Sequence, residues 1–368
     1  MKINKKIYFW LALALIIILG IFWAVKVINA PAATQKIAEK ILGENELAPT
    51  STNKLSPAPV VPKKTTLVFG GDVMLSRVVG QKMVKYQDFF WPFKNVASIF
   101  KDADIAAVNL ESPFTYGGDH TVLTGSFAFN ADPKAISGLK DAGIDLITLA
   151  NNHFGDKGQN GMLDTFDLLA KNQIEYVGAG KNFTEARQGK IIEANGFKFG
   201  FLGYGYLADL YVATGSVAGI ANMNIEQAKK DVSEFKKKVD ILIVEMHAGT
   251  EYIASPNKQQ KDFAHAVIDA GADLVIGHHP HWVQTTEIYQ GKPILYSLGN
   301  LVFDQMWSRE TQQGAIAKAY FKDKNLEKIE IIPIHIYDYG QPQIVKDKIE
   351  IEEILKRMNL KSEIINIK

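Results

Sequence analysis

Six short apolar runs that end in polar residues constrain the fold of this chain most strongly. The runs are rich in Val, Ile and Leu, which is typical of strands that are buried on both faces of a parallel sheet. Segments with helical spacing separate many of them, so the sequence predicts an α/β fold with mixed β-sheets. The six runs, with their polar ends, span residues 66–72, 105–111, 146–153, 241–247, 274–281 and 294–300.

Other patterns predict the helices and the edges of the sheets. Asn195-Gly196 inside the run 190–202 predicts a hairpin, because both residues tolerate the positive φ of a tight turn. The partly alternating run 327–337 predicts one more strand, so we expect antiparallel edges. Helices are predicted at residues 133–142, 161–172, 225–238, 258–270 and 349–358.

The N-terminal segment predicts a membrane anchor. Residues 7–25 contain no charged side chain, and a helix needs roughly 20 such residues to cross a bilayer. Lys2, Lys5 and Lys6 precede the run, so the positive-inside rule places the N-terminus in the cytoplasm and the rest of the chain outside. A cleaved signal peptide is the alternative, although its apolar core usually has only about 7–15 residues. We therefore expect a single-pass protein of the cell membrane.

The chain divides into four parts. Residues 1–28 form the expected membrane anchor, and residues 29–64, with five prolines among small polar residues, are typical of a flexible linker. Residues 65–345 carry the strand and helix patterns of one folded domain. Residues 346–368 are expected to form a C-terminal helix and tail.

Charge and cysteine content exclude several functions. The 41 Lys and Arg residues nearly balance the 40 Asp and Glu residues, so no overall positive field favours nucleic acid as a partner. The chain has no cysteine, which excludes thiolate metal ligands and a cysteine nucleophile. Any metal site must therefore use His, Asp, Glu or Asn.

The polar ends of the runs predict one functional site. Ligands of open α/β sheets bind beyond the carboxyl ends of the strands, and the runs end there in carboxylate, amide and imidazole side chains. These donors suit a divalent transition metal such as Zn, Mn or Fe.

Six motifs resemble the CapA family of bacterial capsule synthesis proteins. That family includes poly-γ-glutamate synthesis proteins of the PgsA type and is similar to the calcineurin-like metallophosphatases. The resemblance implies a metallophosphatase-like layered α/β sandwich that follows the transmembrane helix. The motifs span residues 70–77, 109–113, 150–158, 247–252, 277–282 and 296–300.

The same resemblance implies a site with one or two metal ions. Glu111 would bridge the ions, His153 would protonate the leaving group, and Asp156 would orient His153. The implied metal ligands are Asp72, Glu111, Asn152, His247, His279 and His281. The candidates for substrate binding are Arg77, His278, Glu251, Tyr252 and Asn300.

The chain departs from the metallophosphatase pattern in three places, and in one of them the bridging residue is Glu111 rather than Asp. Met74 stands where those enzymes carry the histidine of Asp-x-His, and a thioether is a poor ligand for a hard cation. This predicts that one metal position is weak or empty. The last motif contains three histidines, and their spacing assigns His279 and His281 as ligands, with His278 as a supporting neighbour.

The resemblance implies a role in capsule or poly-γ-glutamate synthesis and export, with a metal-dependent phosphoesterase-like site. The expected partners are the bilayer, membrane subunits of a capsule or polyglutamate synthase, and an anionic polymer or phosphate ester. Two alternatives remain open. One is a stand-alone extracellular metallophosphoesterase, and the other is a non-catalytic scaffold that binds the polymer.

Overall fold

The computed structural model describes residues 63–117, 128–206 and 211–367. Within those ranges, none of the helices combines the length and the apolar composition that crossing a bilayer requires. The expected membrane span at residues 7–25 and nearly all of the expected linker lie outside the described residues.

One large sheet contains the strand that leads into the site. Its strands follow the order β16-β15-β14-β1-β2-β3-β4, with β13 paired to β1 and β17 paired to β15. Strands β1 to β4 run parallel, whereas β14 runs antiparallel to β1. The bounds are β1 Lys64–Val73, β2 Ile105–Leu110, β3 Leu146–Thr148, β4 Glu175–Val177, β13 Asn300–Val302, β14 Gln313–Lys322, β15 Asn325–Tyr337, β16 Gln341–Ile344 and β17 Ile364–Asn366.

A second sheet supplies the histidine-bearing strands. Its order is β11-β12-β10-β9-β7-β6, and β7, β9, β10 and β12 run parallel. Asn195 and Gly196 have φ values of 52° and 84° between β6 and β7, so the predicted hairpin is confirmed. The bounds are β6 Lys190–Ala194, β7 Phe197–Gly205, β9 Ile241–His247, β10 Leu274–His278, β11 Thr286–Tyr289 and β12 Lys292–Leu295, with a separate small pair of β5 Ala179–Gly180 and β8 Gly219–Ile220.

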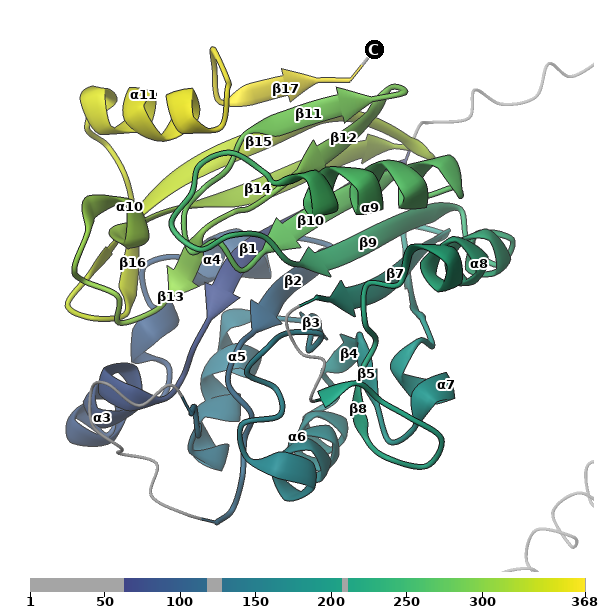
Figure 1. Ribbon diagram of the computed structural model, residues 1–368. Coiled ribbons are helices and arrows are strands. Elements are labelled where there is room, and N and C mark those ends of the chain that lie inside the picture. Colours follow the sequence, from purple (N-terminus) through teal and green to yellow (C-terminus); the bar gives the residue numbers. More distant parts are fainter. Residues whose placement is uncertain (1–62, 118–127, 207–210, 368) are drawn as a thin grey trace, which may run out of the picture. The chain divides into compact units, whose positions relative to one another are not determined.

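The two sheets pack against each other, and helices cover their outer faces (Figure 1). Helices α3, α5 and α6 cover the first sheet, and α8 and α9 cover the second. The predicted layered α/β architecture with mixed sheets is therefore confirmed. The helices are α3 Arg77–Tyr86, α4 Ala97–Lys101, α5 Ile136–Ala142, α6 Gly158–Asn172, α7 Phe183–Ala186, α8 Ile225–Lys236, α9 Lys258–Asp269, α10 Arg309–Gln312 and α11 Lys348–Arg357, with 3-10 turns at Trp91–Phe93 and Pro133–Ala135.

Burial on both faces explains why the strand runs are continuously apolar. In β9, Ile241 and Ile243 face the core between the sheets, while Leu242, Val244 and Met246 face α8 and α9. Successive side chains of a strand point to opposite faces, so both sets must be apolar. The polar residues of such a strand are therefore confined to its carboxyl end.

Strand β14 and the end of the chain differ from the sequence-based expectation. Four of the ten residues of β14 are glycine or alanine, which lack the β-branched signal of a strand, yet β14 pairs with both β1 and β15. Helix α11 agrees closely with the prediction at 349–358. The tail beyond α11 adds β17 to the edge of β15, so it belongs to the sheet.

Candidate metal centre

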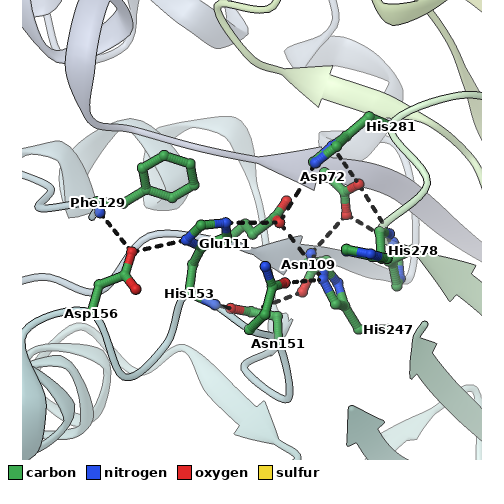
Figure 2. Close-up of polar contacts among 12 residues, drawn as sticks. Asp72, Asn109, Glu111, Phe129, Asn151, His153, Asp156, His247, His278 and His281 are labelled. Atoms are coloured by element: carbon green, nitrogen blue, oxygen red, sulfur yellow. Dashed lines mark hydrogen bonds and ion pairs between the residues drawn. The ribbon is translucent and has the colours of Figure 1, made fainter. Parts of the chain in front are cut away.

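Strand register brings the polar ends of the runs together. Asp72 at the end of β1 lies opposite Asn109 of β2 and Asn300 of β13. In the second sheet, His247 of β9 lies opposite His278 of β10. Because the sheets pack face to face, these ends meet in one polar cluster (Figure 2).

Glu111 lies at the centre of this cluster. It is fully buried, and neither of its carboxylate oxygens has a hydrogen-bond partner among the described residues. Its Oε1 lies 3.6 Å from His247 Nε2, 3.9 Å from His281 Nε2 and 4.0 Å from His153 Nε2. Burial, together with the charge of Asp72, raises the pKa of Glu111 well above its ordinary value. A buried charge without a partner is costly, so this position fits a bound cation.

Two histidines of the last motif complete a ligand group around Glu111. Ligand atoms of Glu111, His279 and His281 all lie within 4.8 Å of one another, and Nδ1 of His279 has no hydrogen-bond partner in the described part of the chain. Burial, followed by the charge of His281, lowers the pKa of His279 to about 3, so the ring is neutral and can donate a lone pair. The backbones of His279 and His281 have φ values of 97° and 57°. Non-glycine residues held in this region cost about 1–3 kcal/mol each, as is common at functional sites.

His247 and Asn152 approach the same point. Nε2 of His247 lies 2.8 Å from Oδ1 of Asn152, and its Nδ1 lies 3.1 Å from the side-chain nitrogen of Asn109. Burial first, and then the neighbouring histidines, lower the pKa of His247 well below its ordinary value. Its ring is therefore neutral, as metal ligation requires.

Asp72 is also fully buried, but protein groups surround it. Oδ1 accepts a hydrogen bond of 2.7 Å from the Asn109 side chain, and Oδ2 accepts one of 3.2 Å from the backbone N–H of His279. Nδ1 of His281 lies 3.5 Å from Oδ2. Burial alone would raise the pKa of Asp72, but His281, His278 and Asn109 outweigh it and the pKa is lowered.

The side chains of Asn300 and His278 are buried and contact neighbouring polar side chains. The buried Oδ1 of Asn300 is 3.0 Å from Nδ1 of His281, so Nε2 of that ring is left to face Glu111. His278 is buried, and its Nε2 lies 2.7 Å from Oε2 of Glu245. The structure thus places both residues in contact with other site residues in the interior.

His153 is held by two residues. Its Nδ1 lies 2.8 Å from Oδ2 of Asp156, and the same oxygen accepts a 2.6 Å hydrogen bond from the backbone N–H of Phe129. The ring of Phe129 stacks on His153 at a centroid distance of 3.9 Å. These contacts direct Nε2 of His153 toward Glu111 (Figure 2).

The remaining substrate-binding candidates lie farther out. Arg77 forms an ion pair with Asp304, and its guanidinium lies 5.0 Å from the centre of the Phe129 ring. The ring of Tyr252 stacks near His281 at 6.1 Å, whereas Glu251 is exposed. Burial, and then Glu251, raise the pKa of Tyr252, so its hydroxyl remains protonated at neutral pH.

Met74 does not take the place of a histidine ligand. Its side chain is buried in the apolar cluster between the first sheet and its helices, and its sulfur accepts a hydrogen bond from the backbone N–H of Ser76. Met74 therefore adds no donor to the polar cluster.

Comparison with known proteins agrees with this arrangement. The family model described as "Bacterial capsule synthesis protein PGA_cap" matches residues 66–305, which include every candidate ligand. The chain belongs to this family.

Two CapA proteins of Bacillus species are similar to this chain and support the family assignment. The PGA biosynthesis protein CapA of Bacillus subtilis (strain 168) is 30% identical over 360 residues, which cover 97% of this chain and 87% of that protein. The capsule biosynthesis protein CapA of Bacillus anthracis is 31% identical over 307 residues, which cover 80% of this chain and 73% of that protein.

Two solved structures resemble this chain only distantly. A hypothetical protein from Thermus thermophilus has a TM-score of 0.45 at 16% identity, with coverage of 75% of this chain and 100% of that chain. The NAD nucleotidase of Haemophilus influenzae has a TM-score of 0.44 at 11% identity, with coverage of 82% and 64%.

Three residues that contact the site were not singled out as candidates from the sequence. Asn109 and Glu245 each lie two positions before a candidate ligand, and this spacing places both on the same strand face as that ligand. Phe129 follows no predicted strand, and its apolar side chain can neither bind a metal nor transfer a proton. Its contact with His153 depends on tertiary packing.

Proposed function

We propose that this protein is a membrane-anchored, extracytoplasmic component of capsule or poly-γ-glutamate synthesis and export, with a metal-dependent hydrolytic site of the phosphoesterase type. Family membership supports the biosynthetic role. The uncharged run at residues 7–25 supports the anchor and its orientation. Membrane subunits of a polymer synthase and an anionic polymer or phosphate ester are the corresponding partners.

The observation that carries the hydrolytic site is the buried carboxylate of Glu111, which lies among imidazole nitrogens and accepts no hydrogen bond from the described residues. The residues that would hold a divalent cation are Asp72, Glu111, Asn152, His247, His279 and His281. A cation bound there would supply Lewis-acid polarisation of a substrate oxygen.

His153 supplies the proton in this proposal. Asp156 holds Nδ1 of the ring, so Nε2 faces the centre and can give a proton to the departing oxygen of an ester. Phe129 covers one face of the ring and limits its rotation. The pair His153 and Asp156 therefore performs the general-acid step.

Metal analysis followed by an activity screen tests the proposal. The full-length protein is purified in detergent, its metal content is measured by mass spectrometry, and hydrolysis of chromogenic phosphate mono- and diesters is assayed with that metal. We expect bound metal and measurable turnover, both lost in Glu111→Gln. Asp262→Asn is a matched control, because Asp262 pairs with Lys258 on the exposed face of α9, away from the centre.

A non-catalytic scaffold is the competing function, favoured by the replacement of a ligand histidine by Met74. The two functions differ in one result. Bound metal without hydrolysis across a broad ester panel contradicts the enzymatic function and supports the scaffold.

A further inference from the structure

A cavity at the edge of the second sheet lies outside the metal centre. It is bounded by residues 183–191, which contain α7 and the start of β6, and by residues 227–238, which contain most of α8. Its volume is about 650 Å³, and none of its lining residues belongs to the polar cluster around Glu111. Cavities of this size accommodate small organic molecules. We call it the α7–α8 cavity.

Arg187 lines this cavity and is buried, with a side chain that is only 5% exposed. Its Nε donates a 2.7 Å hydrogen bond to Oδ2 of Asp231. Nη1 reaches the backbone and side-chain oxygens of Asn222 at the long distance of 3.4 Å, and Nη2 has no hydrogen-bond partner among the described residues. A buried donor on a charged group is costly to leave unpaired, so the guanidinium would gain from a further acceptor.

The carboxylate beside Arg187 already has three donors. Oδ2 of Asp231 accepts the bond from Arg187 and another of 3.1 Å from the hydroxyl of Tyr204. Oδ1 accepts a bond of 2.8 Å from Nε2 of Gln227. Asp231 is thus held by its neighbours, and the acceptor that Nη2 lacks must come from elsewhere.

The charges that line the cavity favour an anion. Glu234 is one of them, but its Oε1 lies 2.7 Å from Nζ of Lys237, which does not line the cavity. Lys238 lines the cavity, and its ammonium forms no hydrogen bond or ion pair with the residues that the structure describes. Since Arg187 is paired with Asp231, Lys238 leaves one positive charge in excess. One charge matches a carboxylate better than a phosphate monoester, which carries about −1.5 to −2.

Apolar side chains form the rest of the wall that matters here. Phe183 and Ile191 are large and apolar, yet they are 42% and 41% exposed, and Phe235 lines the cavity beside them. The centre of the Phe183 ring lies 5.4 Å from Cζ of Arg187, so the ring covers the guanidinium. Exposed side chains change rotamer within nanoseconds, and rotation of this ring would uncover Nη2.

We infer that the α7–α8 cavity binds a small organic carboxylate with an apolar body. The carboxylate pairs with Nη1 and Nη2 of Arg187, in the two-point geometry that guanidinium groups form with carboxylates. The apolar body packs against Phe183, Ile191 and Phe235, and Lys238 adds attraction at the rim. The inference goes beyond the proposed function and does not depend on the metal centre.

Phenylacetate binding to the unaltered protein tests the inference. Phenylacetamide has nearly the same shape without the charge, and acetate has the charge without the apolar body. The full-length protein is kept in detergent with a chelator, so that no cation in the metal centre can bind a carboxylate. Each compound is titrated by saturation-transfer NMR, and the signal of protein-free micelles is subtracted.

Phenylacetate should bind saturably in the millimolar range and at least about 10-fold more tightly than either comparison compound. Equal binding of phenylacetate and phenylacetamide overturns the inference, as does the absence of saturable phenylacetate binding. Neither result bears on the metal-dependent function, because the metal centre is empty in this experiment.

Variants test the roles of the two cations. Arg187→Lys keeps a positive charge beside Asp231 but removes the fork of two nitrogens, and it should weaken phenylacetate binding at least about 10-fold. Lys238→Gln should weaken it about 2–5-fold, as expected for an exposed charge. Lys229→Gln is the matched control, because Lys229 pairs with Glu226 on α8 and does not line the cavity. It should bind like the unaltered protein.

A folded Arg187→Lys that binds phenylacetate like the unaltered protein would show that Arg187 only ties α7 to α8, which overturns the inference. If melting curves show that this variant is unfolded, the comparison of phenylacetate with phenylacetamide in the unaltered protein still decides.

Discussion

His153 is the residue whose surroundings indicate proton transfer most directly. Asp156 binds one ring nitrogen, Phe129 stacks on the ring, and the other nitrogen faces Glu111. His153→Ala should lower turnover by about 10²–10⁴-fold while the metal content stays unchanged, because the side chain donates a proton and binds no metal. This expectation follows from the role proposed for His153 above, and parallel measurements of kcat and bound metal check it. Turnover at the parental rate would exclude the acid role.

The raised pKa of Glu111 predicts a pH effect on the metal-free protein. The folded protein holds the proton on Glu111 well above the ordinary value of 4.5, whereas the unfolded chain releases it near that value. The free energy of unfolding should therefore fall as pH rises from 4.5 through the pKa in the folded state. Glu111→Gln removes this contribution.

Denaturant unfolding in the presence of a chelator measures this effect. The stability of Glu111→Gln relative to the unaltered protein should be greater at about pH 8 than at about pH 5, because the unaltered protein loses stability as the pH rises above 4.5. The charge of Asp72 contributes to the shift, so the difference measures Glu111 together with its interaction with Asp72. An equal difference at the two pH values would show that the carboxyl titrates normally.

At the scale of elements, the close approach of β1 to the loop before β13 places Asp72. A Cβ added at Gly71 would lie 2.0 Å from the carbonyl oxygen of Gly299, the same oxygen that accepts the N–H of Asp72. Gly71→Ala must therefore move backbone, and we expect a loss of about 1–3 kcal/mol in the free energy of unfolding together with weaker metal binding.

Gly117→Ala is the control for this substitution. Among the described residues, its added Cβ would meet nothing closer than Thr115 Oγ1 at 4.0 Å. Denaturant titration and Mn²⁺ binding of both variants check the expectation. Equal stability of the two variants would show that β1 and the Gly299 loop separate at little cost.

At the scale of the whole molecule, the prediction concerns topology. The lysines before residues 7–25 should keep the N-terminus in the cytoplasm and place the folded domain outside. Protease added to intact cells should then degrade the domain, while a cytoplasmic marker protein survives. If the domain resists protease until the membrane is broken, its orientation is opposite to the predicted one. A mature N-terminus at Ala30 or later would indicate that a signal peptide is cleaved.

The alternation of strands and helices, and the kinds of side chain at the strand ends, could be predicted from the sequence. Runs such as 241–247 are apolar because both faces of their strands are buried, and this local pattern also places polar residues at the strand ends. The tertiary structure decided what each polar residue contacts. Asn300 supports His281, and Phe129 covers His153.

The difference between Asp72 and Glu111 could not be predicted in the same way. Both follow apolar runs and both are buried, but of the two it is Asp72 that receives N–H groups from the Asn109 side chain and the His279 backbone. Those partners lie 37 and 207 positions away along the chain. Electrostatic compensation depends on distances in space, which a single sequence does not contain, so only the fold shows that N–H groups of the described residues reach Asp72 and not Glu111.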